Sequence, residues 1–179
     1  MMDTRDLVLA IVGSCPDHKV PGRTILQKIV YFCSVILKLE VDYFPHYYGP
    51  YSEEVSQAVK SLSALGFISE SKHMTNTGLW GYDYQLTKDG TELFSSLSTN
   101  PTLKRVADVV SKILSLEGWN HTQTISCAAK VNFILHRNNQ PMTREAISKE
   151  AEGLGWKLDA GTISSVVSFL ESLNLVTTG

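Results

Sequence analysis

The chain has 179 residues, of which 43% are hydrophobic and 19% are charged, and its formal net charge at pH 7 is −2. This length fits one large or two small domains, and the composition excludes a disordered, collagen-like or low-complexity chain. The slightly negative charge argues against a strongly basic nucleic-acid-binding protein.

No segment of the sequence predicts a membrane span or a disulfide framework. The apolar run at residues 7–12 is too short to cross a bilayer, and no basic segment precedes it. The three cysteines, Cys15, Cys33 and Cys127, lack CxxC spacing, so they indicate neither a disulfide framework nor a zinc site. We therefore expect reduced, mostly buried thiols in a soluble cytoplasmic protein.

The N-terminal region predicts two helices and then an aromatic connector. The first helix spans residues 3–13, with Asp3 as its N-cap. The second begins at Thr24, where Thr24 and Gln27 have the spacing of a capping box. Its apolar residues cover more than one face, which is typical of a central, buried helix. The prolines and glycine of residues 43–51 exclude a helix from the aromatic segment that follows.

A third helix and a β-hairpin complete the predicted N-terminal unit. Ser52 caps a helix with apolar residues at helical spacing, and Gly66 ends it. Residues 67–72 and 79–86 are predicted strands of a hairpin, and one face of the second is aromatic, with Trp80, Tyr82 and Tyr84. Helix, longer helix, helix and hairpin is the order of a winged helix, in which the third helix is the recognition helix and the hairpin is the wing.

The sequence predicts a domain boundary at Asn100, which is a good N-cap before Pro101. We expect a winged-helix domain at 1–99 and a helical, winged-helix-like domain at 100–179. The fold class is thus mainly α with a small β-hairpin. The helices expected in the second domain span residues 101–116, 121–137, 143–152 and 160–173.

Two segments look like copies of one structural unit. Residues 55–68 and 163–176 align at a constant offset of 108, and their apolar positions coincide. Gly66 aligns with Asn174, and both residue types tolerate the left-handed conformation that ends a helix. The alternative is that any two amphipathic helices match after sliding. The matching ends favour a true repeat, which makes the second domain a tri-helical helix-turn-helix unit.

The first 95 residues carry motifs that resemble a known family. These are Leu26-Gln27-Lys28, Tyr31 and the block Tyr48-Gly-Pro-Tyr-Ser52. Together they resemble the YwgA-like proteins of bacteria and archaea and, more distantly, are similar to the Panacea domain of phage-associated and antitoxin proteins. The resemblance implies a winged-helix-like fold without a known enzyme activity. Panacea-type relatives neutralise toxins by protein contact, and some act as adaptors.

The charge pattern permits a DNA interface on the first predicted recognition helix. Residues 1–100 carry a net charge of −3 and residues 101–179 a net charge of +1. Gln57 is suited to reading adenine and Lys60 to contacting a phosphate or guanine, although Glu53 and Glu54 would repel the DNA backbone. Scattered, solvated charge is the alternative. The candidate nucleic-acid-binding residues are Arg23, Lys28, Ser56, Gln57, Lys60, Lys72 and His73.

The aromatic segment 43–51 has two interpretations. It is either a partner-binding patch or a structural connector whose tyrosines pack on the helix that carries Tyr31. In the second predicted recognition helix, Phe169 is expected at the edge of the apolar stripe, on a face suited to contact with a protein. The candidate partner-binding residues are Tyr47, Tyr48, Tyr51 and Phe169.

We find no catalytic or metal-binding pattern in the sequence. The five histidines form no HxH or HxxxH pair, and no phosphate-binding loop or nucleophile elbow occurs. We therefore expect no enzyme activity, no metal and no cofactor. The leading hypothesis is a homodimeric transcriptional regulator that binds double-stranded DNA, and the alternative is a protein-interaction module or antitoxin-like adaptor that binds a protein partner.

Overall fold

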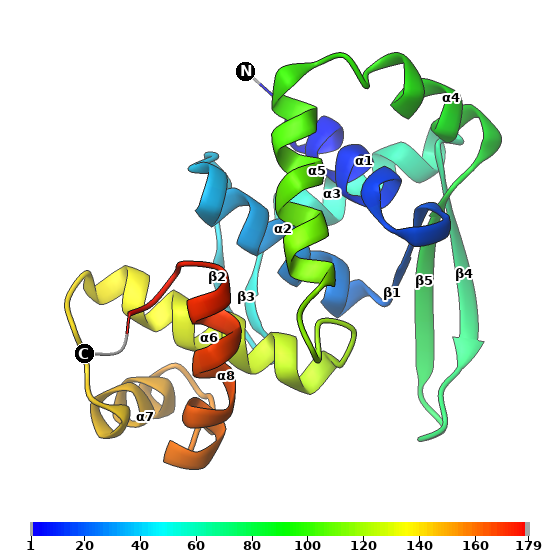
Figure 1. The fold of residues 1–179 in the computed structure, drawn as a ribbon. Coiled ribbons are helices and arrows are strands. Elements are labelled where there is room, and N and C mark those ends of the chain that lie inside the picture. The colour runs from blue at the N-terminus through cyan, green and yellow to red at the C-terminus, as the bar shows by residue number, and fades with distance from the viewer. Residues whose placement is uncertain (1, 178–179) are drawn as a thin grey trace.

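The computed structural model describes residues 2–177, which form a mainly helical structure with two small antiparallel sheets (Figure 1). The α-helices are α1 (Thr4–Ser14), α2 (Arg23–Leu37), α3 (Glu53–Ala64), α4 (Lys88–Ser96), α5 (Pro101–Leu114), α6 (Thr122–Asn138), α7 (Arg144–Gly153) and α8 (Ala160–Ser172), and a 3-10 turn spans Pro16–His18. The strands are β1 (Lys19–Pro21), β2 (Phe44–His46), β3 (Gly49–Tyr51), β4 (Ile68–Met74) and β5 (Trp80–Leu86).

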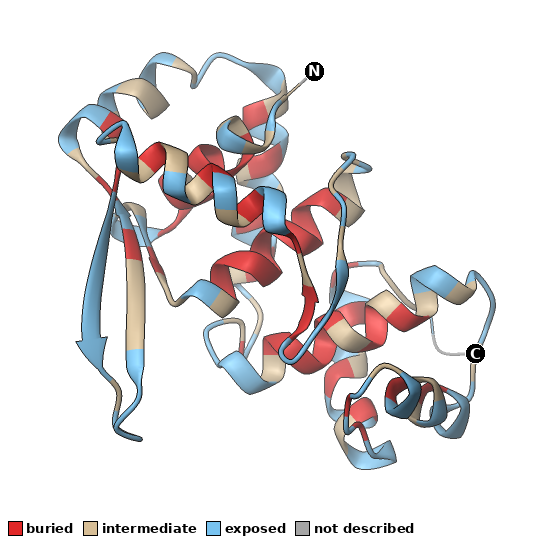
Figure 2. Cartoon of the chain, turned by 180° about the vertical axis from the view of Figure 1, so that it is seen from behind, coloured by how far each residue is buried: buried red, intermediate tan, exposed pale blue. Residues whose placement is uncertain are grey.

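Helix α2 is the centre of the structure, as its apolar residues predict. All of its residues from Ile25 to Ser34 are buried, and it lies against α1, α5, α6 and the strand β3. Figure 2 shows burial concentrated along the central helices, whereas β4 is exposed from its second residue onward. A helix that is apolar on more than one face needs neighbours on all sides, and α2 has them from both halves of the chain.

The start of α2 differs from the predicted capping box. The helix follows Gly22, whose φ of 106° is available to glycine, and no side chain caps it. Gln27 instead hydrogen-bonds to the backbone of Ser52. The capping-box prediction was therefore wrong, because a tertiary partner takes the amide that local spacing assigned to the helix end.

The two sheets are small and entirely antiparallel in the described residues. The predicted hairpin is present as β4 and β5, and β1 adds to it in the order β1-β5-β4. Strand β1 lies between the two helices predicted at 3–13 and from Thr24, where the sequence predicts no strand. Strands β2 and β3 form a second hairpin in the aromatic connector, where two prolines suit an isolated two-stranded ribbon because its outer edges need no ladder hydrogen bonds.

The C-terminal half packs directly onto the N-terminal half. Helix α5 follows the N-cap Asn100 and lies against α1 and α2. Helix α6 lies against α2 and β3, and α7 and α8 pack on α6 (Figure 1). One hydrophobic core therefore includes residues of both predicted domains, and the boundary at Asn100 stays a prediction.

The ends of α3 and α8 share one hydrogen-bond pattern. Gly66 and Asn174 both have positive φ, at 79° and 57°. The residue after each, at position 67 or 175, donates its N–H to the carbonyl five positions earlier, at 2.9 Å in both cases. These are the bonds of a left-handed helix ending. The two helices therefore end in the same way at the 108-residue offset, although α2 and α7 have endings of this kind as well.

Within residues 2–177, no helix combines the length and the apolar character needed to cross a membrane. The same part of the chain contains no cluster of three or more histidine, cysteine or acidic side chains with the geometry to hold a metal ion. All three cysteines are buried and unbridged, as expected.

The contact between the two halves includes a buried hydrogen bond that can be tested. The Tyr31 hydroxyl on α2 donates to Oδ1 of Asn132 on α6, at 2.8 Å. We expect Tyr31→Phe to lower the free energy of unfolding by about 1–3 kcal/mol, because the amide oxygen of Asn132 stays buried without its donor. Urea denaturation measures the change. The matched control is Tyr47→Phe on the exposed ribbon turn, for which we expect no change; equal effects of both variants would contradict this role.

Candidate functional site

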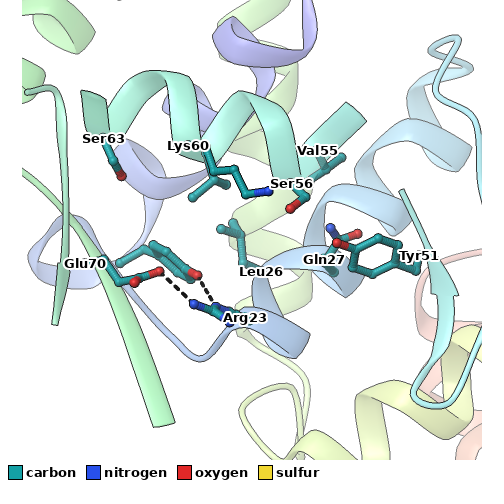
Figure 3. Close-up of a pocket in the computed structure, with 11 residues that line it drawn as sticks. Arg23, Leu26, Gln27, Tyr51, Val55, Ser56, Lys60, Ser63 and Glu70 are labelled. Atoms are coloured by element: carbon teal, nitrogen blue, oxygen red, sulfur yellow. Dashed lines mark hydrogen bonds and ion pairs between the residues drawn. The ribbon is translucent and has the colours of Figure 1, made fainter. Parts of the chain in front are cut away.

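A groove between α3 and the β4–β5 hairpin is the candidate functional site (Figure 3). It has a volume of about 510 Å³, and its floor is apolar, with Leu26, Val55 and Val59. Its rim is polar and draws on α2, α3, β3, β4 and β5. The rim residues are Arg23, Gln27, Tyr51, Ser56, Lys60, Ser63, Glu70 and Tyr84.

One wall of the groove is positioned by a clamp from α2. The Gln27 amide donates to the carbonyl of Ser52 at 2.9 Å and accepts from its N–H at 3.1 Å. One residue along, Nζ of Lys28 donates to the carbonyl of Pro50 at 2.7 Å. Ser52 in turn is the N-cap of α3, with its side chain accepting from the N–H of Val55. The clamp therefore sets where α3 begins.

The opposite wall holds Arg23 in a fixed orientation. Its Nε donates to the Tyr84 hydroxyl at 2.9 Å, and its Nη2 lies 3.4 Å from a carboxylate oxygen of Glu70. Its guanidinium also lies over the Tyr82 ring, 3.8 Å from the centroid. Figure 3 shows Arg23 and Lys60 facing the groove from different elements. The amine of Lys60 makes no ion pair or hydrogen bond with another residue in the described range.

A row of alternating cations and aromatic rings continues from Arg23 along the hairpin. Nζ of Lys72 lies 3.9 Å from the Trp80 ring centroid and 5.9 Å from that of Tyr82. The cross-strand pairs Lys72 with Tyr82 and Met74 with Trp80 explain this order, because side chains two residues apart share one face of a strand. The indole of Trp80 is 56% exposed, so the row ends in an accessible aromatic surface.

The predicted nucleic-acid residues are thus divided by the structure. Arg23, Ser56 and Lys60 line the groove. Lys72 lies near the same Tyr82 ring as Arg23 does, so it extends this surface. Gln57 is exposed, and its amide donates to Glu53 at 2.8 Å. His73 follows Lys72 in β4, so it faces the other side of the hairpin, where it lies 3.9 Å from Asp83.

Lys28 requires a correction. Its side chain is only 2% exposed, and its amine donates to Pro50, so it has no access to a phosphate. Burial, together with the positive charge of Lys130, lowers its pKa to about 7. The sequence showed a cation on a helix, but its position on the inner face of α2 makes it a structural hydrogen-bond donor.

The predicted partner-binding residues are also divided. Tyr47 and Tyr48 are 75% and 43% exposed at the turn between β2 and β3, whereas Tyr51 lines the groove. Phe169 requires a correction, because it is only 5% exposed and packs against Phe32 with ring centroids 5.7 Å apart. Its face of α8 is covered by this chain, so it is not free for a partner.

Sequence reasoning did not select Glu70, Tyr82 or Tyr84 as site residues. The aromatic alternation in β5 was visible and could have suggested Tyr82 and Tyr84. Glu70 had no comparable signal, because its role depends on the register that places it opposite Tyr84 and beside Arg23. The groove as a whole offers cations, hydroxyls and aromatic faces, which bind ligands by charge, hydrogen bonding and stacking.

The buried amine of Lys28 predicts a pH dependence of stability. In the unfolded chain a lysine holds its proton up to about pH 10.4, whereas in the folded chain the pKa of Lys28 is lowered to about 7. The unfolded state then binds more protons between these values, so stability rises with pH.

The free energy of unfolding of the native chain minus that of Lys28→Met should therefore increase with pH. We expect this difference to rise by at most about 1.4 kcal/mol per pH unit between pH 7 and 10. Urea denaturation at pH 7, 8 and 9 measures this difference, and Lys60→Met, which removes an exposed amine, is the control. A constant difference between the native chain and Lys28→Met over this range would show that the amine is not desolvated.

Comparison with known proteins places the chain in a family. No family model matches it. Over 116 residues the chain is 30% identical to the uncharacterized protein YwgA of Bacillus subtilis (strain 168), and this match covers 56% of the chain and 68% of the relative. The clamp residues of α2 and the 48–52 block, which carried the resemblance in sequence, have the structural role described above. The chain belongs to the YwgA family.

Proposed function

We propose that the N-terminal unit is a winged helix that binds double-stranded DNA through α3 and the β4–β5 hairpin. The order of its elements supports this proposal, with helix, strand, helix, the β2–β3 ribbon, helix and two strands, and a sheet in the order β1-β5-β4. In this fold the third helix enters the major groove and the hairpin lies beside it. Helix α3 has 12 residues, which gives a length of about 18 Å, enough to follow one major groove.

The observation that carries the proposal is the gathering of cations on one surface. Arg23 and Lys60 line the groove beside α3, and Lys72 extends the same surface along the hairpin. Lysine and arginine on a common face neutralise DNA phosphates and release their counterions. Ser56 adds a hydroxyl suited to a phosphate or a base edge. Glu70 and Glu53 oppose these charges, so the expected affinity is moderate and strongly dependent on salt.

We extend the proposal to the whole chain as a transcriptional regulator with tandem winged-helix-like units. The matching ends of α3 and α8 support the second unit. A homodimer would present two α3 helices to two half-sites, as twofold-symmetric operators require. In this arrangement the first unit supplies the DNA contacts, because α8 offers serines and a glutamate but no lysine or arginine.

Two substitutions in the groove test DNA binding, one expected to lower the affinity and one expected to raise it. We expect Lys60→Glu to weaken binding of a mixed-sequence duplex by about tenfold or more at low salt. Glu70→Gln removes the carboxylate beside Arg23 and should strengthen binding several-fold. Fluorescence anisotropy titrations at two salt concentrations measure both changes. Lys149→Glu on α7 changes the net charge equally and is the control. Equal weakening by Lys149→Glu and Lys60→Glu would show that only the net charge of the chain matters. No binding of the native chain at low salt would overturn the proposal.

The exposed turn of the β2–β3 ribbon favours a second candidate function, contact with a protein partner. Tyr47 and Tyr48 pack edge to face with centroids 4.8 Å apart, and both are accessible. Exposed tyrosines are enriched in protein interfaces because they bury large surfaces at little cost in entropy.

This second function predicts a clean separation of binding from stability. We expect Tyr47→Ser with Tyr48→Ser to abolish a copurifying complex without changing the melting temperature, because neither ring is in the core. Size-exclusion chromatography of the complex and circular dichroism of the isolated chain measure the two effects. Recovery of the same complex from the double variant would remove the ribbon turn from the interface.

A further inference from the structure

A second groove, of about 650 Å³, lies on the C-terminal unit. Its floor comes from α6, α7 and α8 and is apolar, with Leu135, Ile147, Val167 and Leu170 among its residues. Two non-helical segments form its sides, residues 140–143 before α7 and residues 175–177 after α8. Both segments run at the end of the molecule marked by the C-terminus in Figure 1.

The two grooves lie beside equivalent helices of the two copies of the repeat. Helix α8 corresponds to α3 at an offset of 108, and Val167 of the second groove corresponds to Val59 of the first. Helix α7 precedes α8 in the chain as α2 precedes α3. Gly22 and Thr143 are the N-caps, and the residues that follow place an arginine in each groove, Arg23 in the first and Arg144 in the second.

In the first copy the corresponding place contains a strand. There β5 lies between β1, which precedes α2, and β4, which follows α3. Its Tyr84 and Leu86 are buried, and its backbone pairs with Val20 of β1 and Ile68 of β4. In the second copy residues 140–143 precede α7 and residues 175–177 follow α8, but no segment of residues 2–177 runs between them as a strand.

The backbone along both sides of the second groove is available for pairing. Met142 and Val176 form no backbone hydrogen bond with any residue of the described chain. Their side chains are half-buried and apolar and line the groove. Unpaired backbone edges beside an apolar floor are the features that a sheet offers to an added strand.

We propose that this groove binds an extended segment of a partner protein, which enters as a β-strand between residues 140–143 and 175–177. The strand runs antiparallel to both sides, as β5 does to β1 and β4. Large apolar side chains at alternate positions face the floor, as Tyr84 and Leu86 do in the first copy.

Arg144 defines the chemistry of one position in that segment. In the first copy, Arg23 donates to the hydroxyl of Tyr84. Arg144 has no ion pair or hydrogen bond with a described side chain, so its guanidinium is free to donate to an acceptor on the incoming strand. The segment we expect therefore has a tyrosine opposite Arg144 and a leucine or similar residue two positions later.

The first copy also supplies a probe for the experiment. A fluorescein-labelled peptide with the sequence of residues 78–87 contains the whole of β5. We expect it to bind the full-length chain, and we expect Val167→Asp and Met142→Glu each to weaken binding at least about tenfold. Ser168→Asp introduces the same charge on the same helix outside the groove and should bind as the native chain does. Thermal melts monitored by circular dichroism verify that each variant is folded.

Hydrogen exchange locates the contact independently of the variants. The amides of Met142 and Val176 should exchange rapidly in the free chain and slowly with the peptide bound, because strand addition gives them acceptors. Three results would overturn the proposal: no peptide binding at about 1 mM, binding that Val167→Asp and Met142→Glu leave unchanged, or self-association abolished by Val167→Asp, which would assign the groove to a second copy of this chain.

Discussion

The clamp between α2 and residues 50–52 is the constraint on which the rest of the structure depends. Gln27 satisfies both backbone groups of Ser52, and Lys28 satisfies the carbonyl of Pro50. All of these groups are buried, so each would be costly without its partner. Because Ser52 caps α3, fixing this short segment fixes the start and direction of the helix that lines the candidate site. The paired residues Gln27-Lys28 and Pro50-Tyr-Ser52 are thus a structural unit that positions α3, and Gln27 and Tyr51 also line the groove.

The same ribbon connects the two halves of the chain. The carbonyl of His46 accepts a hydrogen bond of 2.7 Å from the indole of Trp156, and Gly49 lies so close to α6 that a β-carbon there would come within 3.1 Å of Lys130. Gly49 also has a φ of 101°, so a side chain there would be strained in conformation and would crowd Lys130. A ribbon held by α2 on one side and by α6 and Trp156 on the other gives the C-terminal unit a fixed position relative to α3. Contacts made at either groove are therefore made by parts of one packed body.

Local sequence patterns predicted the helices well because most of their ends are encoded locally. Asp3, Ser52, Thr87, Asn100 and Thr143 each cap a helix with their own side chains. The failures share a different cause, since they depend on contacts between distant residues. Lys28 and Phe169 were assigned to the surface. In the structure Lys28 lies on the inner face of α2 and donates to Pro50, and Phe169 packs on Phe32. Strand β1 has three residues and exists because β5 pairs with it. The same distinction applies to the candidate site. Lys60 could be predicted from the pattern of α3 alone, whereas predicting Glu70 would have required knowledge of the register of the β4–β5 hairpin.

The two repeat copies present two different surfaces. In the first copy β5 covers the apolar side of the helices and brings Tyr82 and Tyr84 against Arg23, so the accessible surface is one of cations and rings. In the second copy the corresponding helices keep their apolar side open as a groove, and the polar face of α8 lacks basic residues. Charge on one unit and an open strand position on the other suit different classes of ligand. We therefore propose complementary tasks for the two units, in which the first binds a charged polymer and the second holds an extended chain.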